Sequence, residues 1–159
     1  FADRAACTAD PDFVPVPVAA LLDPAYAEQR RGQLDMARSQ AFFKSLGFSF
    51  NPQFTNEQGA CMVVSDEHNY VMLLVEPFFK GFTNKPVADA TKGTEVLICL
   101  SCSSRDEVDE LVKKALAAGG TAPMPAQDHG FMYGHGFTDL DGHMWELMFM
   151  DPNAAPPQA

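Results

Sequence analysis

One supersecondary pattern occurs twice in this chain, and this repeat constrains the fold more than any other feature. By hydrophobic periodicity, each copy reads as a strand, a helix and three further strands. The stretch NYVMLLVEP (69–77) aligns with MWELMFMDP (144–152), and both copies end in an acidic residue followed by proline. A repeated unit of this kind predicts two halves of one topology, related by a pseudo-twofold axis.

The first copy is expected over residues 13–76, after a loose polar segment, 1–12. Its first strand is expected in FVPVPVAAL (13–21), where two prolines favour a position at a sheet edge. Residues 22–36 follow as an insertion that forms an extra helix or a long loop, or the N-terminus is rearranged, so the true position of the first strand stays open. The helix and the three later strands are expected in ARSQAFFKSLGF (37–48), SFNPQFTN (49–56), ACMVVSD (60–66) and YVMLLVE (70–76). Gly47 is expected to end this helix.

The second copy is expected over residues 94–152, between a connecting segment, 77–93, and a short tail, 153–159. The phenylalanines of the connecting segment indicate that it packs down onto the protein. A helix is expected in SSRDEVDELVKKALAAGG (103–120), because a serine can cap its start, acidic residues fill its first turns and two glycines end it. Strands are expected in TEVLICLSC (94–102), TAPMPAQD (121–128), GFMYGHGFTD (130–139) and HMWELMFMD (143–151).

Composition narrows the range of partners. The formal net charge of −10 opposes binding to phosphate backbones or anionic membranes, so no nucleic acid or membrane partner is expected. No apolar run approaches the roughly 20 residues that cross a bilayer, and the first residues do not read as a secretion signal. The four cysteines lie mostly in or beside apolar strands, which favours reduced, packed thiols and a cytoplasmic location.

The ending D-x-D-G-x-x-W-E-h (where h is an apolar residue), seen here in DLDGHMWEL (139–147), follows a repeated βαβββ module. This combination resembles the vicinal oxygen chelate superfamily, which includes glyoxalases, bleomycin-resistance proteins and extradiol dioxygenases. Stretches such as ACMVVSD, YVMLL and DGHMWELMFMDP are similar to those of bacterial lactoylglutathione lyase-like proteins. The resemblance implies an α+β fold in which two tandem βαβββ modules form a half-open mixed β-barrel.

The resemblance also implies where a metal would be bound. Metal-dependent members take one ligand from the first strand and one from the last strand of each module. Only one of the four corresponding positions carries a ligand-type side chain, and they fall on Phe13, Val71, Leu97 and Glu146. One carboxylate does not hold a transition metal specifically. No cofactor is therefore expected, and Ni, Zn, Fe or Mn is disfavoured.

The histidines offer a competing metal site. Alternation along the last strand puts His143 on the face opposite Glu146, so we expect a turn or capping histidine there. His129 is expected in a loop. His135 shares a strand face with Tyr133 and is taken to reach the cavity, so Glu146 with His135 is the pair expected if a metal is bound.

The last strand places Met144, Glu146 and Met148 on one face, which is expected to line the hollow. An apolar pocket with soft methionine walls suits a small, partly hydrophobic ligand. Glu146, expected to be buried there, either acts on the ligand or bonds to a neighbouring Tyr, Ser or backbone amide. The other expected pocket residues are Phe13, Val71, Leu97, Cys99, Ser101, Tyr133 and His135.

These residues leave three functions open. The leading hypothesis is a metal-independent protein that binds a small apolar or aromatic molecule. The alternative is a lyase or isomerase of the lactoylglutathione lyase type with Glu146 as general base. A metal-dependent dioxygenase is the weaker alternative. A homodimer is expected, because strand edges and the phenylalanine-rich connecting segment offer surfaces for pairing.

Overall fold

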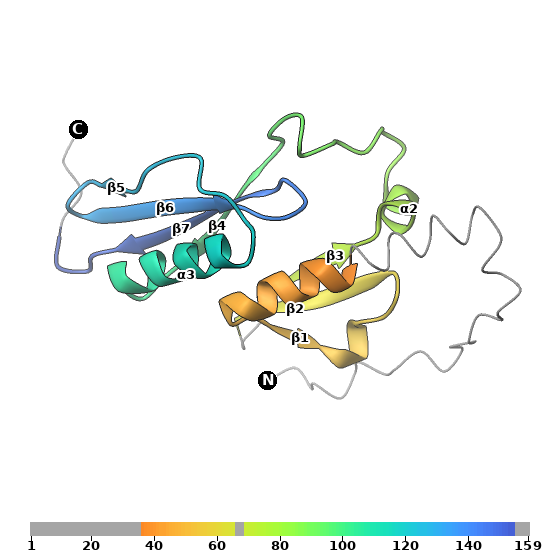
Figure 1. The fold of residues 1–159 in the computed structure, drawn as a ribbon, viewed down its shortest axis with the longest axis horizontal. Coiled ribbons are helices and arrows are strands. Elements are labelled where there is room, and N and C mark those ends of the chain that lie inside the picture. Colours follow the sequence, from red (N-terminus) through yellow and green to blue (C-terminus); the bar gives the residue numbers. More distant parts are fainter. Residues whose placement is uncertain (1–35, 66–68, 155–159) are drawn as a thin grey trace, which may run out of the picture. The chain divides into compact units, whose positions relative to one another are not determined.

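The computed structural model describes residues 36–65 and 69–154 (Figure 1). Contacts divide the chain into two compact units, Phe1–Val87 and Ala88–Ala159, and the division falls within the expected connecting segment. The strand expected at 13–21, including Phe13, and nearly all of the expected insertion lie outside the described residues. In the part of the chain that is described, no helix is long and apolar enough to cross a membrane.

The first unit packs one helix on a three-stranded antiparallel sheet. The helix covers residues 36–46 and ends at Gly47, whose φ of 107° is readily adopted only by glycine. The sheet has the order β1-β2-β3. Its strands are β1 (Ser49–Asn51), β2 (Gly59–Ser65) and β3 (Asn69–Leu74). The helix buries Met36, Phe42, Phe43 and Leu46.

The first of the strands expected after this helix is shorter than the sequence pattern indicated. β1 stops at Asn51, and Pro52–Phe54 form a 3-10 turn, η3. The Asn51 side chain accepts a hydrogen bond from the Gln53 amide at 3.0 Å and caps this turn. Proline is well suited to the start of such a turn and cannot donate to a strand ladder, so the strand ends here.

Strand register corrects the expected position of Val71. Met62 pairs with Phe50 on one side and with Val71 on the other. The Lys44 ammonium of the helix lies 5.6 Å from the centre of the Phe50 ring, so these three paired residues share the helix-facing side. The open face instead carries Tyr70 and Met72, each 47% exposed. Met72 thus occupies the face that Val71 was expected to occupy, because a one-residue shift reverses every side chain of a strand.

The connecting segment forms a short helix, α2 (Glu76–Phe79), and a 3-10 turn, η4 (Lys80–Phe82). Its phenylalanines do not pack down as expected. Phe82 is 68% exposed, and its ring meets Phe78 edge-on at 5.2 Å. An exposed aromatic pair is a surface that a second copy could cover, and the homodimer stays a prediction.

The second unit is a complete β-α-β-β-β module (Figure 1). Its sheet has the order β4-β7-β6-β5, in which β4 runs parallel to β7 and the other pairs are antiparallel. The strand expected over 121–128 is reduced to two residues, because prolines 123 and 125 cannot donate to a ladder. The elements are β4 (Leu97–Ser101), α3 (Arg105–Ala117), β5 (Gln127–Asp128), β6 (Met132–Thr138) and β7 (Met144–Met150).

The helix α3 begins and ends as its sequence predicts. The Ser104 hydroxyl accepts a hydrogen bond from the Glu107 amide at 3.1 Å. The Glu107 carboxylate accepts from the Ser103 amide and hydroxyl, both at 2.6 Å, and these bonds lower the pKa of Glu107. This arrangement resembles a capping box, except that the Glu107 carboxylate bonds to Ser103, the residue before the N-cap Ser104. Gly119 follows the helix with a φ of 98°.

One face of the second sheet is covered by α3. Val108, Val112 and Ala115 of the helix are buried, as are Trp145 and Leu147 of β7. The Trp145 ring also stacks with Phe137 of β6, with the ring centres 6.2 Å apart. Because side chains alternate along a strand, Met144, Glu146 and Met148 lie on the face away from α3.

Candidate functional site

Glu146 lies near the middle of the sheet face away from α3. It pairs with Cys99 of β4 on one side and with Gly136 of β6 on the other. Within the second unit its side chain is exposed, whereas its apolar neighbours in sequence predicted burial. The face on which it lies agrees with the alternation of β7.

A pocket of about 160 Å³ opens on this face beside Glu146. One wall comes from the segment between α3 and β5, and the floor comes from β4, β6 and β7. Apolar side chains dominate, with the Glu146 carboxylate and the Gln127 amide among the polar groups. The lining residues are Leu97, Pro123, Met124, Pro125, Gln127, Met132, Gly134, His135, Gly136, Phe137, Met144, Trp145 and Glu146.

The structure brings together several of the residues expected in the pocket. Leu97 and Met144 are paired neighbours in the lining, next to Glu146. Three other expected residues lie on the same face by strand register but do not line the pocket. These are Cys99, Ser101 and Met148. The face expected from the alternation of β7 is therefore the face that carries the pocket.

Tyr133 and His135 lie on the opposite face, and this corrects their expected position. Register pairs His135 with buried Leu147, on the side covered by α3, and Tyr133 follows the same alternation. The Tyr133 hydroxyl donates a hydrogen bond to Asp109 of α3 at 2.7 Å. His135 borders the pocket, but its face is not the face of Glu146. The expected metal pair of Glu146 with His135 is split by the sheet.

The Glu146 carboxylate accepts no hydrogen bond from any residue in the described ranges. The expectation that a neighbouring Tyr, Ser or backbone amide satisfies it is therefore not met there. The Glu146 charge affects the neighbouring Cys99 instead. Burial and the nearby carboxylate both raise the pKa of the Cys99 thiol. A high pKa keeps the thiol protonated and poorly nucleophilic.

Cys99 and Cys102 are separated by two residues, a spacing shared with redox and zinc motifs. Here the spacing falls on the end of β4, and a strand rises about 3.3 Å per residue. Their α-carbons are thus too far apart for a disulfide without movement of the backbone. Burial, with Glu107 nearby, raises the pKa of Cys102 to about 11. Both residues are free cysteines, as the sequence predicted.

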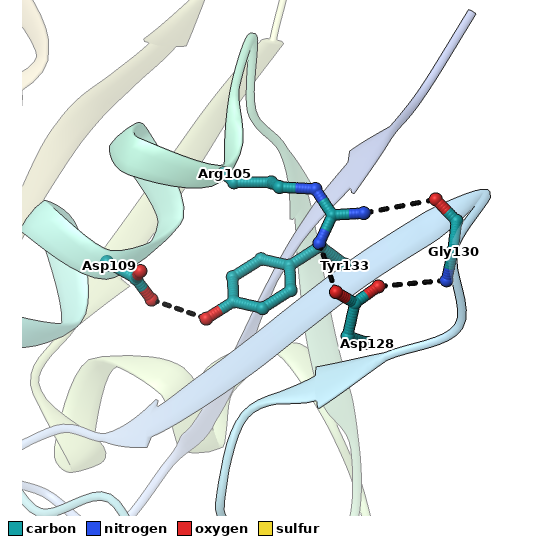
Figure 2. A network of polar contacts seen from close by, with 5 residues as sticks. All are labelled: Arg105, Asp109, Asp128, Gly130 and Tyr133. Carbon is teal, nitrogen blue, oxygen red and sulfur yellow. Dashed lines mark hydrogen bonds and ion pairs between the residues drawn. The ribbon is translucent and has the colours of Figure 1, made fainter. Parts of the chain in front are cut away.

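A polar network holds the hairpin of β5 and β6 against the start of α3 (Figure 2). The Arg105 guanidinium forms an ion pair with Asp128 and donates to the Gly130 carbonyl at 3.0 Å. Its charge lies over the Tyr133 ring, 5.2 Å from the ring centre. Because this hairpin supplies Gln127 to the pocket, the network positions that wall of the site.

The network makes the stability of this hairpin depend on pH. Arg105 lowers the pKa of Asp128 from its usual value of 3.8, so the pair stabilises the fold above that pH and loses its contribution as the pH falls. We expect Arg105→Met to lower the melting temperature at pH 7, and the difference from wild type to shrink towards pH 3. Calorimetry across this range checks the trend, and a difference that grows on acidification would contradict it. Lys113→Met, which removes an exposed pair with Glu110, is the matched control.

Sequence reasoning missed the wall formed by Pro123, Met124 and Pro125, because it interpreted this segment as a strand. It also missed Gly134 and Gly136, which lie on the same face as Glu146. The alternation Gly-His-Gly in YGHGF was the available signal, since glycines two apart leave one strand face without side chains.

The described residues do not fit the metal site of the superfamily. They contain no cluster of three or more His, Cys, Asp or Glu side chains able to hold an ion. At the position expected on β4, Leu97 has no donor atom, and neither Val71 nor Met72 of β3 offers nitrogen or oxygen. Glu146 is the one hard ligand among these positions, and a specific transition-metal site needs several convergent donors.

The chain belongs to the Glyoxalase/Bleomycin resistance protein/Dioxygenase superfamily. The family model matches residues 33–147, which includes all of α3 and most of both sheets. The match confirms the resemblance seen in the sequence and the mixed α+β fold.

Solved structures support the same fold. A hypothetical protein from S. aureus is 28% identical, with a TM-score of 0.60 over 71% of this chain and 84% of that one. A superfamily enzyme from Burkholderia phytofirmans PsJN is 15% identical, with a TM-score of 0.58 over 72% of this chain and 89% of that one. A glyoxalase-related enzyme from Fulvimarina pelagi is 19% identical, with a TM-score of 0.59 over 71% and 78%.

A short stretch of this chain also matches two much longer curated proteins. The Acylase ACY 1 proenzymes of Pseudomonas sp. strains SE83 and V22 are each 52% identical over 46 residues. This stretch is 29% of the present chain and 8% of each acylase. The activity of the acylases therefore carries no argument for this chain.

Proposed function

We propose that this protein binds a small apolar or aromatic molecule in the pocket beside Glu146, and that it does so without a metal. The observation that carries the proposal is a carboxylate on the floor of an apolar pocket that accepts no hydrogen bond from the described residues. Leu97, Met132 and Met144 offer soft apolar contacts around it. A ligand with a flat or aliphatic body and a hydrogen-bond donor or positive charge complements both features.

The position of Glu146 also supports catalysis as the alternative. A general base must reach the proton that it removes, and the exposed carboxylate borders the space where a ligand would lie. A lyase or isomerase of the lactoylglutathione lyase type would use Glu146 in this way. A carboxylate that only anchors a ligand and one that removes a proton differ in whether the bound molecule is changed.

Ligand titration of wild type and Glu146→Gln tests the proposal. The probe is proflavine, a planar aromatic cation, and binding is followed by calorimetry and fluorescence. Because a hydrogen bond to a charged group contributes about 1.5–3 kcal/mol, we expect Glu146→Gln to bind at least about tenfold more weakly. Glu110→Gln on the exposed side of α3 is the matched control, since it removes the same charge far from the pocket lining.

Three results would decide between the hypotheses. Saturable binding that weakens in Glu146→Gln but not in Glu110→Gln supports the proposed binding function. If wild type turns over the hemithioacetal of methylglyoxal and glutathione and Glu146→Gln does not, the lyase replaces the proposed binding function. Stoichiometric Ni, Zn, Fe or Mn in the purified protein overturns the metal-independent proposal.

A further inference from the structure

Two glycines of β6 lie on the pocket side of the sheet, and the fold explains only one of them. Gly136 pairs with Glu146, and a Cβ atom added there would lie 2.8 Å from the Trp145 carbonyl oxygen. Backbone cannot easily move away from such a contact, so packing between β6 and β7 requires glycine at 136.

Gly134 has no such requirement. An added Cβ would meet the Leu147 carbonyl oxygen at 3.7 Å, which is an ordinary van der Waals contact. Its φ is not in the left-handed region, where glycine would be needed. Glycine inside a strand also costs stability relative to alanine. The fold thus accepts a side chain at Gly134, yet the position is a bare part of the pocket lining.

The absence of side chains at both glycines leaves exposed backbone as part of the pocket floor beside Glu146. Met132 stands at one end of this bare stretch and Glu146 beside the other. A planar ring can lie flat on exposed peptide groups and keep contact over its whole face, whereas a rounded ligand touches such a surface only locally. Dispersion contacts add up only where surfaces lie close together.

We propose that Gly134 is a specificity-determining residue, which selects planar aromatic ligands that place a donor or positive charge at Glu146. This inference rests on the proposed binding function and adds the shape of the ligand to it. The ring lies along the glycine floor, and its charged edge faces the carboxylate.

Two cationic probes of different shape test this inference. Proflavine is flat, whereas 1-aminoadamantane carries its charge on a rounded cage. We expect wild type to bind proflavine at least about tenfold more tightly than the cage amine. In Gly134→Ala the added methyl group lifts the ring from the floor, so the preference should fall to about threefold or less. Gly93→Ala, where an added Cβ meets nothing within 4 Å, should keep the wild-type preference.

Thermal unfolding separates this effect from damage to the fold. Because alanine suits a strand better than glycine, Gly134→Ala should melt at the wild-type temperature or above it. Lost preference with unchanged stability supports the inference. A preference for proflavine that survives in Gly134→Ala overturns it but leaves the binding function standing. Binding of neither probe by wild type overturns the binding function, and this inference with it.

Discussion

Asp139→Ala should cause the largest loss of stability in the second unit, because it removes a buried hydrogen-bond acceptor. Asp139 is 8% exposed, and its carboxylate accepts three hydrogen bonds. The Asp141 and His143 amides donate to Oδ1, each at 3.0 Å, and the Trp145 indole Nε1 donates to Oδ2 at 2.9 Å. The substitution leaves a buried indole N–H without this partner and loosens the turn before β7. Such losses typically cost about 3 kcal/mol in all.

Urea unfolding measures this loss, and a double-mutant cycle with Trp145→Phe assigns it. Phenylalanine removes the indole donor but keeps an aromatic ring in the core. If the indole bond carries much of the effect, Asp139→Ala should cost distinctly less in the Trp145→Phe background than in wild type. Equal losses in the two backgrounds would show that the turn alone accounts for the effect. A total loss below about 1 kcal/mol would contradict the structural role of Asp139.

Gly142→Ala should have the second largest effect, because two costs coincide at this position. Gly142 has a φ of 94°, which side-chain-bearing residues rarely adopt. An added Cβ would also lie 2.8 Å from the Thr91 nitrogen and 2.9 Å from the Ala90 carbonyl carbon. Both are backbone atoms, so the strand entry and the segment before β4 would have to separate. Backbone strain and overpacking together suggest a loss of about 2 kcal/mol.

A second glycine separates these two costs. Gly130 has a φ of 78°, but an added Cβ there meets nothing within 4 Å. Gly130→Ala therefore reports strain alone, and we expect it to cost about 1 kcal/mol. The difference between the two variants in urea unfolding measures the steric contact at Gly142. Equal losses would mean that the contact with the 90–91 segment is relieved without cost.

Much of the local structure follows from sequence because its causes are local. Ser104, Glu107 and Gly119 define the ends of α3 through caps that involve only nearby residues. The motif DLDGHMW likewise contains both the turn and its carboxylate acceptor. Along β7, alternation alone separated Trp145 and Leu147 from Glu146, and the structure keeps that separation.

The candidate site was predicted less completely because it depends on register between strands. Alternation within β6 divides its residues into two sets, but it does not say which set faces Glu146. The pairing of Gly136 with Glu146 makes that choice, and it turns Tyr133 and His135 towards α3. A one-residue shift moved Val71 of β3 to the helix side for the same reason.

The sequence by itself determined the repeated module, the ends of α3 and the presence of one carboxylate on an apolar strand face. These depend on periodicity and on contacts between near neighbours in the chain. Only the tertiary structure decided that glycines flank this carboxylate and that the segment around Met124 forms a wall beside it. Strand pairing joins residues distant in sequence, so the shape of the pocket is a property of the assembled sheet.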